Sequence, residues 1–267
     1  MGWEVVRDAE DGPAYEVLAR DRVWNCFGIA DLEPPFRQDT TVSFARDGDQ
    51  VASLTVLDRS DLRVISPFGD RDGVRTLLAQ LWLPDDAFCQ IQHVHLQALD
   101  GLFQPLGDWQ EMVRMNVTPE TSAPVQRDPR IEQLDQHDRD ELRGFYGPLA
   151  RGPFPDLQLI HGLFFGIRTD GRLASAAGTH VMTCRYGIAV VGGVLTRPDQ
   201  RGQGLAASLV AHLTRALFDR GCHDVALNVA VDNAVALRLY ERLGFREHMR
   251  FASAPVQRVR ASSVLEP

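Results

Sequence analysis

Apolar positions in the last third of the chain follow two different periods. Leucine recurs every four residues at positions 205, 209, 213 and 217, which predicts a helix over residues 205–220 that ends at Gly221. Nearly continuous apolar runs on either side predict buried strands over residues 186–196 and 225–229. Strands therefore alternate with helices, which indicates a mixed α/β fold.

The pattern continues with a second helix and a last strand. Asn233 is a favourable N-cap for a helix over residues 234–243, and a strand is expected from Phe245. Gly192 and Gly193 interrupt the strand that precedes the first helix, and paired glycines in a strand indicate a bulge or a close approach of the backbone.

Two distant segments share one local pattern. Residues 45–53 and 167–175 each read as strand, Asp-Gly turn and strand. The second segment lies inside a longer predicted hairpin over residues 157–168 and 172–183.

A further similarity relates residues 102–107 to residues 239–244 in the same order along the chain, so we expect two copies of one domain. The stretch 118–124, rich in Thr and Pro, reads as the linker. The predicted domains are residues 1–120 and 125–267.

The composition excludes several classes of function. The net charge of −8 argues against a nucleic-acid partner, and no apolar run is long enough to cross a membrane. All 28 basic residues are Arg, which excludes a Lys-dependent phosphate loop and a Lys Schiff base. The 4 cysteines are scattered and the N-terminus resembles no secretory signal, so we expect a cytoplasmic protein. His93 and His95 lack a third ligand, so no metal site is expected.

The segment 201–206, Arg-Gly-Gln-Gly-Leu-Ala, lies between a predicted strand and a predicted helix. Glycines let backbone N–H groups turn toward a ligand, and the helix N-terminus favours an anion at the same point. The spacing also fits a dinucleotide-binding oxidoreductase through Gly202, Gly204, Ala207 and Asp224. Against that alternative, several residues separate the strand from the first glycine, where the dinucleotide fold needs an immediate turn.

The order of these features resembles the GNAT superfamily of acyl-CoA N-acyltransferases over about residues 160–254. Arg201, Gly204 and Ala206 match its pyrophosphate motif. The later matches are Asn228, Asn233, Leu239-Tyr240 and Leu243-Gly244-Phe245. The resemblance implies two tandem GNAT-like domains, each a mostly antiparallel twisted sheet flanked by helices, and acetyl-CoA as cosubstrate.

The resemblance also implies roles for single residues. Backbone groups of Val194 and Thr196 would pair with the pantetheine arm, and a backbone N–H near Leu195 would stabilise the oxyanion. Tyr240 would protonate the departing thiolate, and His180 is the candidate general base. The residues expected to bind the cosubstrate are Val194, Thr196, Arg201, Gly202, Gln203, Gly204, Leu205, Ala206, Asn228 and Asn233.

The first copy departs from the motif where the chemistry needs it. Alignment of Gly73 with Gly204 sets Asp70 opposite Arg201 and Arg75 opposite Ala206, so Asp70 and Asp72 would repel a pyrophosphate. In the same alignment Phe103 falls opposite Tyr240, and Leu96 falls near the place of Asn233. The first domain is therefore expected to be a degenerate copy without an acyl-CoA site.

The sequence indicates only the class of the acetyl acceptor. We expect a primary amine of a small molecule or peptide, attacked directly in a ternary complex, and a monomer or homodimer. The loop 144–158 is expected to shape the acceptor site through Tyr146, Arg151, Phe154 and Asp156, and the acidic net charge favours a cationic acceptor. The alternative is a non-catalytic acyl-CoA-binding sensor or interaction module.

Overall fold

The protein divides into two compact units that do not follow the order of the chain. The structure, a computed structural model, describes residues 2–124, 128–149, 154 and 156–259. Unit 1 comprises the chain up to Leu18, Asp39–Glu111 and the segment from Arg250 onward, and unit 2 comprises Ala19–Gln38 and Met112–Met249. These units differ from the predicted ranges 1–120 and 125–267, because each half of the chain gives a segment to the other unit.

Unit 2 is built on a mixed sheet with the strand order β8-β9-β10-β11-β12-β7. Neighbouring strands are antiparallel except β11 and β12, which are parallel. The strands are β7 (Gln110–Val117), β8 (Glu132–Gln133), β9 (Phe164–Thr169), β10 (Arg172–Thr183), β11 (Ile188–Thr196) and β12 (Asp224–Ala230). The helices are α2 (Cys26–Ala30), α4 (Arg139–Tyr146), α5 (Asp156–His161), α6 (Leu205–Phe218) and α7 (Ala234–Arg242).

Unit 1 repeats the same topology in the order β1-β2-β3-β4-β5-β13. Its parallel pair is β4 and β5, joined through α3 as β11 and β12 are joined through α6. The strands are β1 (Glu4–Val6), β2 (Thr40–Asp47), β3 (Gln50–Arg59), β4 (Leu62–Gly69), β5 (Asp86–Ile91), β6 (Phe103–Pro105) and β13 (Arg246–Arg258). The helices are α1 (Asp11–Leu18), α3 (Arg71–Gln80) and the 3₁₀ segment η3 (His93–Leu99). The expected mixed α/β fold with a repeated domain is confirmed.

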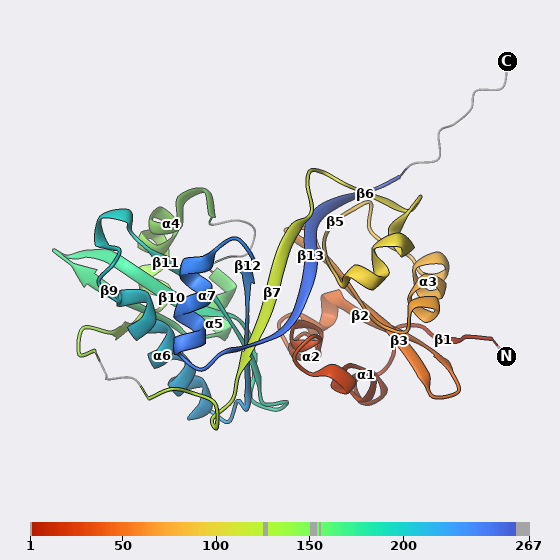
Figure 1. Ribbon diagram of the computed structural model, residues 1–267, viewed down its shortest axis with the longest axis horizontal. Helices are drawn as coiled ribbons and strands as arrows, with labels where there is room; N and C mark the ends of the chain where they lie inside the picture. The colour runs from red at the N-terminus through yellow and green to blue at the C-terminus, as the bar shows by residue number, and fades with distance from the viewer. Residues whose placement is uncertain (1, 125–127, 150–153, 155, 260–267) are drawn as a thin grey trace, which may run out of the picture. The chain divides into compact units, whose positions relative to one another are not determined.

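The last sheet strand of each half lies in the other unit (Figure 1). β7 pairs with β12 from Val117 opposite Val225 to Met112 opposite Ala230. Its side chains Val113, Met115 and Val117 are buried in the core of unit 2. β13 pairs with β5 in unit 1, where Ala252 and Val256 join the core. Each core is therefore completed by a strand from the other half of the chain.

The sheet of unit 2 has an apolar cluster on each face. Alternate side chains of a strand point to opposite faces, so one strand contributes to both clusters. On β9, Phe165 and Ile167 join the core cluster that contains α6, whereas Phe164 joins a second cluster with Leu142 and Tyr146 of α4. All four leucines predicted to line one face of α6 are buried. That prediction, and the helix that starts after Asn233, are confirmed.

Two expectations about local structure were wrong. Residues 157–161 belong to helix α5, so the hairpin begins only at Phe164. The similarity between residues 102–107 and 239–244 has no structural counterpart, because the first segment contains the strand β6 and the second lies mostly in helix α7. Phe103 is therefore not equivalent to Tyr240. In unit 1 the segment η3 follows β5, as α7 follows β12 in unit 2. The N-cap of η3 is Gln92, so Gln92, and not Leu96, takes the place of Asn233.

Candidate active site

The candidate site is a cleft where β11 and β12 separate. Their parallel register runs from Ile188 opposite Asp224 to Val191 opposite Leu227, and both strands continue beyond these pairs. Gly193 has a positive φ of 59°, and the register between β10 and β11 shifts by one residue next to it. This bulge is the irregularity that the paired glycines predicted, and it turns β11 away from β12. The cleft has a volume of about 1070 Å³.

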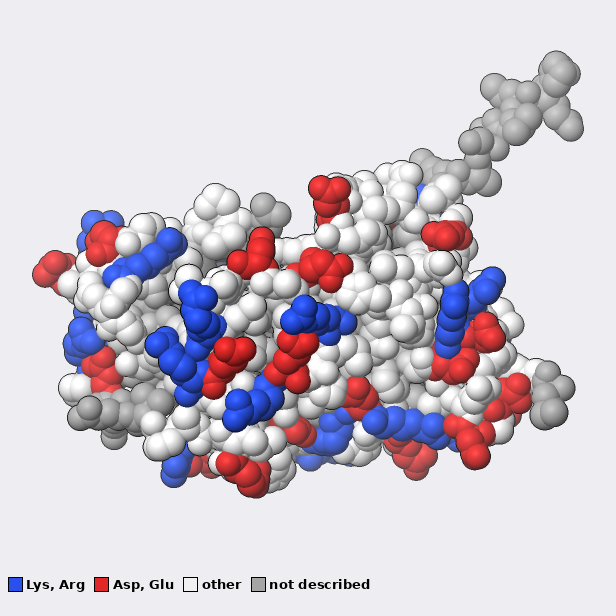
Figure 2. Space-filling view, in the orientation of Figure 1, with Lys and Arg blue, Asp and Glu red and all other residues white. Residues whose placement is uncertain are grey.

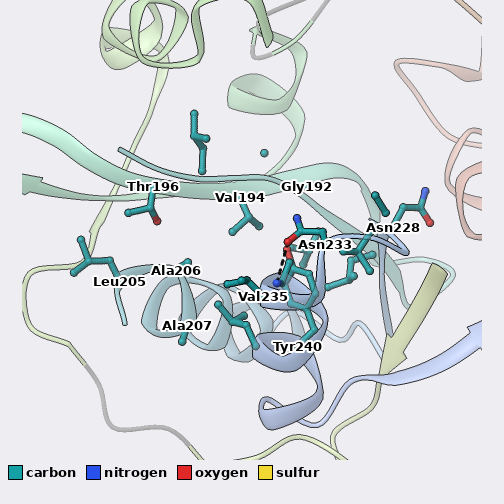
Figure 3. Close-up of a pocket in the computed structure, with 18 of the residues that line it drawn as sticks. Gly192, Val194, Thr196, Leu205, Ala206, Ala207, Asn228, Asn233, Val235 and Tyr240 are labelled. Carbon is teal, nitrogen blue, oxygen red and sulfur yellow. Dashed lines mark hydrogen bonds between the residues drawn. The ribbon is translucent and has the colours of Figure 1, made fainter. Parts of the chain in front are cut away.

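Backbone orientation along β11 separates the residues that face the cleft from those that face β10. Arg197 donates its N–H to the carbonyl of Ala174, and Ser175 Oγ donates to the carbonyl of Leu195. Because N–H and C=O of one strand residue point to the same side, the polar groups of Leu195 face β10. Those of Val194 and Thr196 alternate with them and face the cleft. Figure 3 shows the two residues opposite the start of α6.

The N-terminus of α6 lines one part of the cleft. Its N-cap is Gly204, which has a φ of 76° and no side chain to bond the first N–H groups. A Cβ at this position would meet no atom within 4 Å, so it is the left-handed backbone that requires glycine. Open N–H groups and the helix dipole favour a phosphate here.

Cationic side chains near this point are few. Arg201 and Arg242 line the cleft, and Arg201 Nε also donates to the carbonyl of Thr196 at 3.3 Å. Figure 2 shows Arg interspersed with Asp and Glu over α6 and α7, so the viewed face carries no continuous surface of one sign. Gln203 does not line the cleft, and its side chain donates to Gln200 instead.

Helix α7 brings two predicted residues to the opposite wall (Figure 3). Asn233 caps the helix by accepting a hydrogen bond from the N–H of Ala236 at 3.1 Å, which leaves its amide nitrogen to donate. Tyr240 is buried, packs on Phe245 with ring centroids 5.8 Å apart, and lines the cleft. Burial raises the pKa of Tyr240 to about 12, so the hydroxyl is protonated at neutral pH.

Asn228 lies at the edge of the cleft and has a structural partner. Its side chain points away from Asn233 (Figure 3), and its carbonyl oxygen accepts a hydrogen bond from Arg114 Nε at 2.9 Å. The buried Arg114 guanidinium also lies over the ring of Trp24 at 4.8 Å and bonds the Trp24 carbonyl. Sequence reasoning missed Arg114, whose role appears only when β7 lies beside β12.

His180 forms another part of the wall. It lies at a bulge in β10, and its imidazole covers Gly192, where a Cβ would come within 2.1 Å of Nε2. The ring also faces Phe27 and Phe154, with centroids 6.3 and 6.2 Å away. The side chain is open to the cleft while protein surrounds its other sides, and this desolvation lowers the pKa of His180. The imidazole is therefore neutral at pH 7 and can accept a proton.

The end of the cleft beyond His180 is apolar. Tyr146, Leu149 and Phe154 line it, and Tyr146 donates a hydrogen bond from its hydroxyl to the Gly193 carbonyl. Asp156 is paired with Arg143 at 2.7 Å, and Arg151 lies outside the described residues. No Asp or Glu is among the described residues that line the cleft.

At the corresponding place in unit 1, a side chain caps the helix N-terminus. Asp70 caps α3, and its carboxylate accepts hydrogen bonds from the N–H groups of Asp72 and Gly73 at 2.8 and 3.2 Å. A Cβ on Gly73 would come within 2.8 Å of the Trp3 ring, so this glycine serves close packing. The first N–H groups of α3 therefore bond to this chain's own carboxylate, whereas the sequence suggested only that Asp70 and Asp72 would repel a pyrophosphate.

The buried His95 in unit 1 is expected to make the protein less stable in acid. His95 is fully buried, and neither ring nitrogen has a hydrogen-bond partner among the described residues. Burial lowers its pKa below the usual 6.5, so on acidification the unfolded chain takes up a proton that the folded chain resists. We expect the free energy of unfolding to fall as pH drops below about 6.5.

The measurement compares the wild type with His95→Leu in urea unfolding at about pH 7.5 and about pH 5.5. The variant should lose less stability between the two conditions. Equal losses would show that His95 does not contribute to the acid sensitivity.

Comparisons with known proteins agree with the geometry. The sequence profile of the Acetyltransferase (GNAT) family matches residues 129–245. The [Ribosomal protein bS18]-alanine N-acetyltransferase of Escherichia coli is 34% identical over 107 residues, which cover 40% of this chain and 70% of that protein. The N-alpha-acetyltransferase MAK3 of Arabidopsis thaliana is 40% identical over 88 residues, which cover 33% of this chain and 45% of that protein.

A tandem GNAT protein from the clavulanic acid biosynthesis pathway shares the fold over 98% of this chain and all of its own, with a TM-score of 0.58 and 14% identity. The chain belongs to the GNAT family, a family of acyl-CoA-dependent acetyltransferases. In the part of the chain that the structure describes, no helix is long and apolar enough to cross a membrane. The same residues contain no group of three or more His, Cys, Asp or Glu side chains placed to hold a metal ion.

Proposed function

We propose that unit 2 transfers an acetyl group from acetyl-CoA to a primary amine by direct attack in a ternary complex. The observation that carries the proposal is a helix N-terminus without a side-chain cap at the mouth of a cleft whose walls carry His180 and Tyr240. A phosphate anchor, a base and an acid on one cleft are what acyl transfer from a phosphorylated thioester requires.

Acetyl-CoA is proposed to lie along β11. The backbone groups of Val194 and Thr196 pair with the pantetheine amides, and the N–H groups of residues 202–206 bind the pyrophosphate. Arg201 adds a charge-assisted hydrogen bond to phosphate. The Asn233 amide nitrogen donates to the cosubstrate, whereas Asn228 acts through Arg114 as support for β12.

The reaction then uses three groups of the chain. His180 takes a proton from the acceptor nitrogen, whose lone pair attacks the thioester carbonyl carbon. We assign the oxyanion donor to the N–H of Val194 instead of Leu195, because the polar groups of Leu195 face β10. The C–S bond breaks, and Tyr240 gives its proton to the sulfur.

The acceptor is proposed to carry an apolar or small group next to its amine. Tyr146, Leu149 and Phe154 form an apolar wall, and none of the described cleft residues is acidic, so the cationic acceptor suggested by net charge lacks a partner here. The two curated relatives are named for acetylation of a protein α-amine or of an alanine. A peptide N-terminus with a small or apolar first residue satisfies both observations.

The test measures CoA release from acetyl-CoA with a panel of amines. Peptides that begin with Ala and an arylalkylamine should be acetylated in preference to a polyamine or a Lys side chain. Binding of acetyl-CoA without transfer to any amine would favour the sensor alternative, and preference for the polyamine would overturn the acceptor assignment.

Tyr240→Phe is expected to lower kcat by about 10²–10⁴-fold while the affinity for acetyl-CoA changes little. The ring keeps its packing on Phe245, and the hydroxyl acts only as the thiolate leaves, so its loss removes transition-state stabilisation alone. Steady-state kinetics and calorimetry check the two halves of the prediction. Tyr186→Phe, in the same unit but not among the cleft residues, is the control; wild-type turnover in Tyr240→Phe would make Tyr240 a packing residue.

A further inference from the structure

His180 is in the lining of two cavities of unit 2. One is the cleft, and the other is a small cavity of about 30 Å³. Part of the small cavity is formed by the first half of the chain, through Ala30, Pro34, Pro35 and Phe36. The rest comes from the end of α5 and from β10. A cavity of about 10–15 Å³ already accommodates one water molecule when polar groups line it.

The polar groups of the small cavity are incompletely paired. Gln158 is only 8% exposed, and its Nε2 donates to the backbone carbonyl of His180 at 3.4 Å. Its Oε1 is buried and has no hydrogen-bond partner among the described residues. A buried acceptor without a partner costs about 1–3 kcal/mol, so a water in the cavity is its expected partner. His161 also lines the cavity and is exposed to solvent.

We propose that water in this small cavity carries the acceptor's proton from His180 to solvent, with Gln158 as the positioning residue of the water and His161 at the exit. The proposal rests on the proposed function and extends it. The small cavity provides a route that does not pass through the cleft, which the acyl donor and the acceptor fill during the reaction.

The proton balance requires such a route. A primary amine arrives mainly as an ammonium ion, and its conversion to an amide with release of CoA thiol frees one proton per turnover. That proton leaves the ammonium nitrogen for His180, and the N–H electron pair becomes the attacking lone pair. His180 then passes the proton to the water bound at Gln158. The second nitrogen proton leaves as the amide forms and returns through solvent to the Tyr240 oxygen, which has given its own proton to sulfur, so one proton in all is released.

The test uses the full chain with two variants that disturb the water in different ways. Gln158→Leu removes the amide, and Ala30→Val fills the cavity from the opposite wall without touching Gln158. Each should lower kcat at least about tenfold, a part of the ~10²–10⁴ that general acid–base catalysis supplies. Each should also raise the solvent deuterium isotope effect on kcat and leave acetyl-CoA affinity unchanged. Ile160→Leu, at an exposed position of the same helix that does not line the cavity, is the control and should keep wild-type kcat.

A second readout does not depend on acetyl transfer. Exchange of the His180 imidazole N–H with water, followed by ¹⁵N NMR while CoA and an N-acetylated peptide fill the cleft, should be slower in Ala30→Val than in wild type. Equal exchange rates, or wild-type isotope effects in both cavity variants, overturn the relay even where acetyl transfer is found. Absence of transfer to every amine in the wild type would instead contradict the proposed function, while the exchange measurement still decides the relay.

Discussion

Replacement of Gly204 by Glu is expected to abolish acetyl-CoA binding. Gly204 holds a φ of 76° at the N-cap of α6, a backbone that L side chains rarely adopt. A carboxylate at this position would also reach the first N–H groups of the helix, as the carboxylate of Asp70 does in α3. The variant would therefore turn the proposed anion site of unit 2 into the capped arrangement of unit 1.

Calorimetry measures the effect. The wild type should bind one acetyl-CoA per chain, and the affinity of Gly204→Glu should fall by at least about 100-fold, which corresponds to about 2.7 kcal/mol. Gly171→Glu is the matched control, because Gly171 has a φ of 74° and open space around it but lies in the turn between β9 and β10. Two equal sites in the wild type, or unchanged binding in Gly204→Glu, would contradict the assignment of the site.

A fragment of residues 125–267 is expected not to fold, although it holds every proposed catalytic group. It lacks β7, which pairs with six consecutive residues of β12 and buries Val113, Met115 and Val117. Burial of three such side chains contributes together about 5–9 kcal/mol. That is comparable to the 5–15 kcal/mol by which folded domains are typically stable.

The same fragment loses other contacts of unit 2. Arg22 in the first half donates to Asp224 at 2.9 Å and to the carbonyl of Tyr186 at 2.7 Å. Asp21 bonds His248 at 2.8 Å. Burial raises the pKa of Asp21, but hydrogen bonds from His248 and from the Trp24 N–H outweigh it, so the pKa is lowered. In addition, β13 would have no β5 to pair with. The fragment would thus expose two unpaired strand edges, which favours aggregation.

Solubility, a thermal melting curve and acetyl-CoA binding of the fragment check this prediction. Co-expression of residues 1–124 with 125–267 is the control, because it restores every non-covalent partner and differs only by one cut peptide bond. The pair should melt cooperatively and bind acetyl-CoA. A soluble, monomeric fragment as active as the full chain would show that the first half is dispensable, and the structural role assigned to it would be wrong.

The first half of the chain contributes directly to the candidate active site. Its segment from Ala19 to Gln38 belongs to unit 2, sets Phe27 against His180 and forms one wall of the small cavity. Unit 1 has a capped helix N-terminus, yet the chain that forms it supplies a strand, a buried Trp24 and a cavity wall to the unit that carries the proposed chemistry.

The sequence by itself determined the features that depend on neighbours within a few residues. The leucine period of α6, the cap at Asn233 and the turn-forming glycines of the 201–206 loop all follow from local geometry. The order of these features along the chain was enough to indicate the fold and the family. The mixed α/β topology is confirmed for the same reason, because short connections leave few ways to arrange alternating strands and helices.

Only the tertiary structure decided which strands lie side by side and which residues line the same cavity. The alternation in a strand tells which face is buried but not which strand lies beside it, so the exchange of β7 and β13 left no trace in the sequence pattern. The bulge between β10 and β11 shifts their register by one residue, and such a shift reverses which residues of β11 point their N–H groups at β10. The direction of the Leu195 N–H therefore depends on the bulge. Arg114, Phe27 and Gln158 acquire their roles from partners between 22 and 153 residues away in the chain, and no local pattern records contacts of that separation.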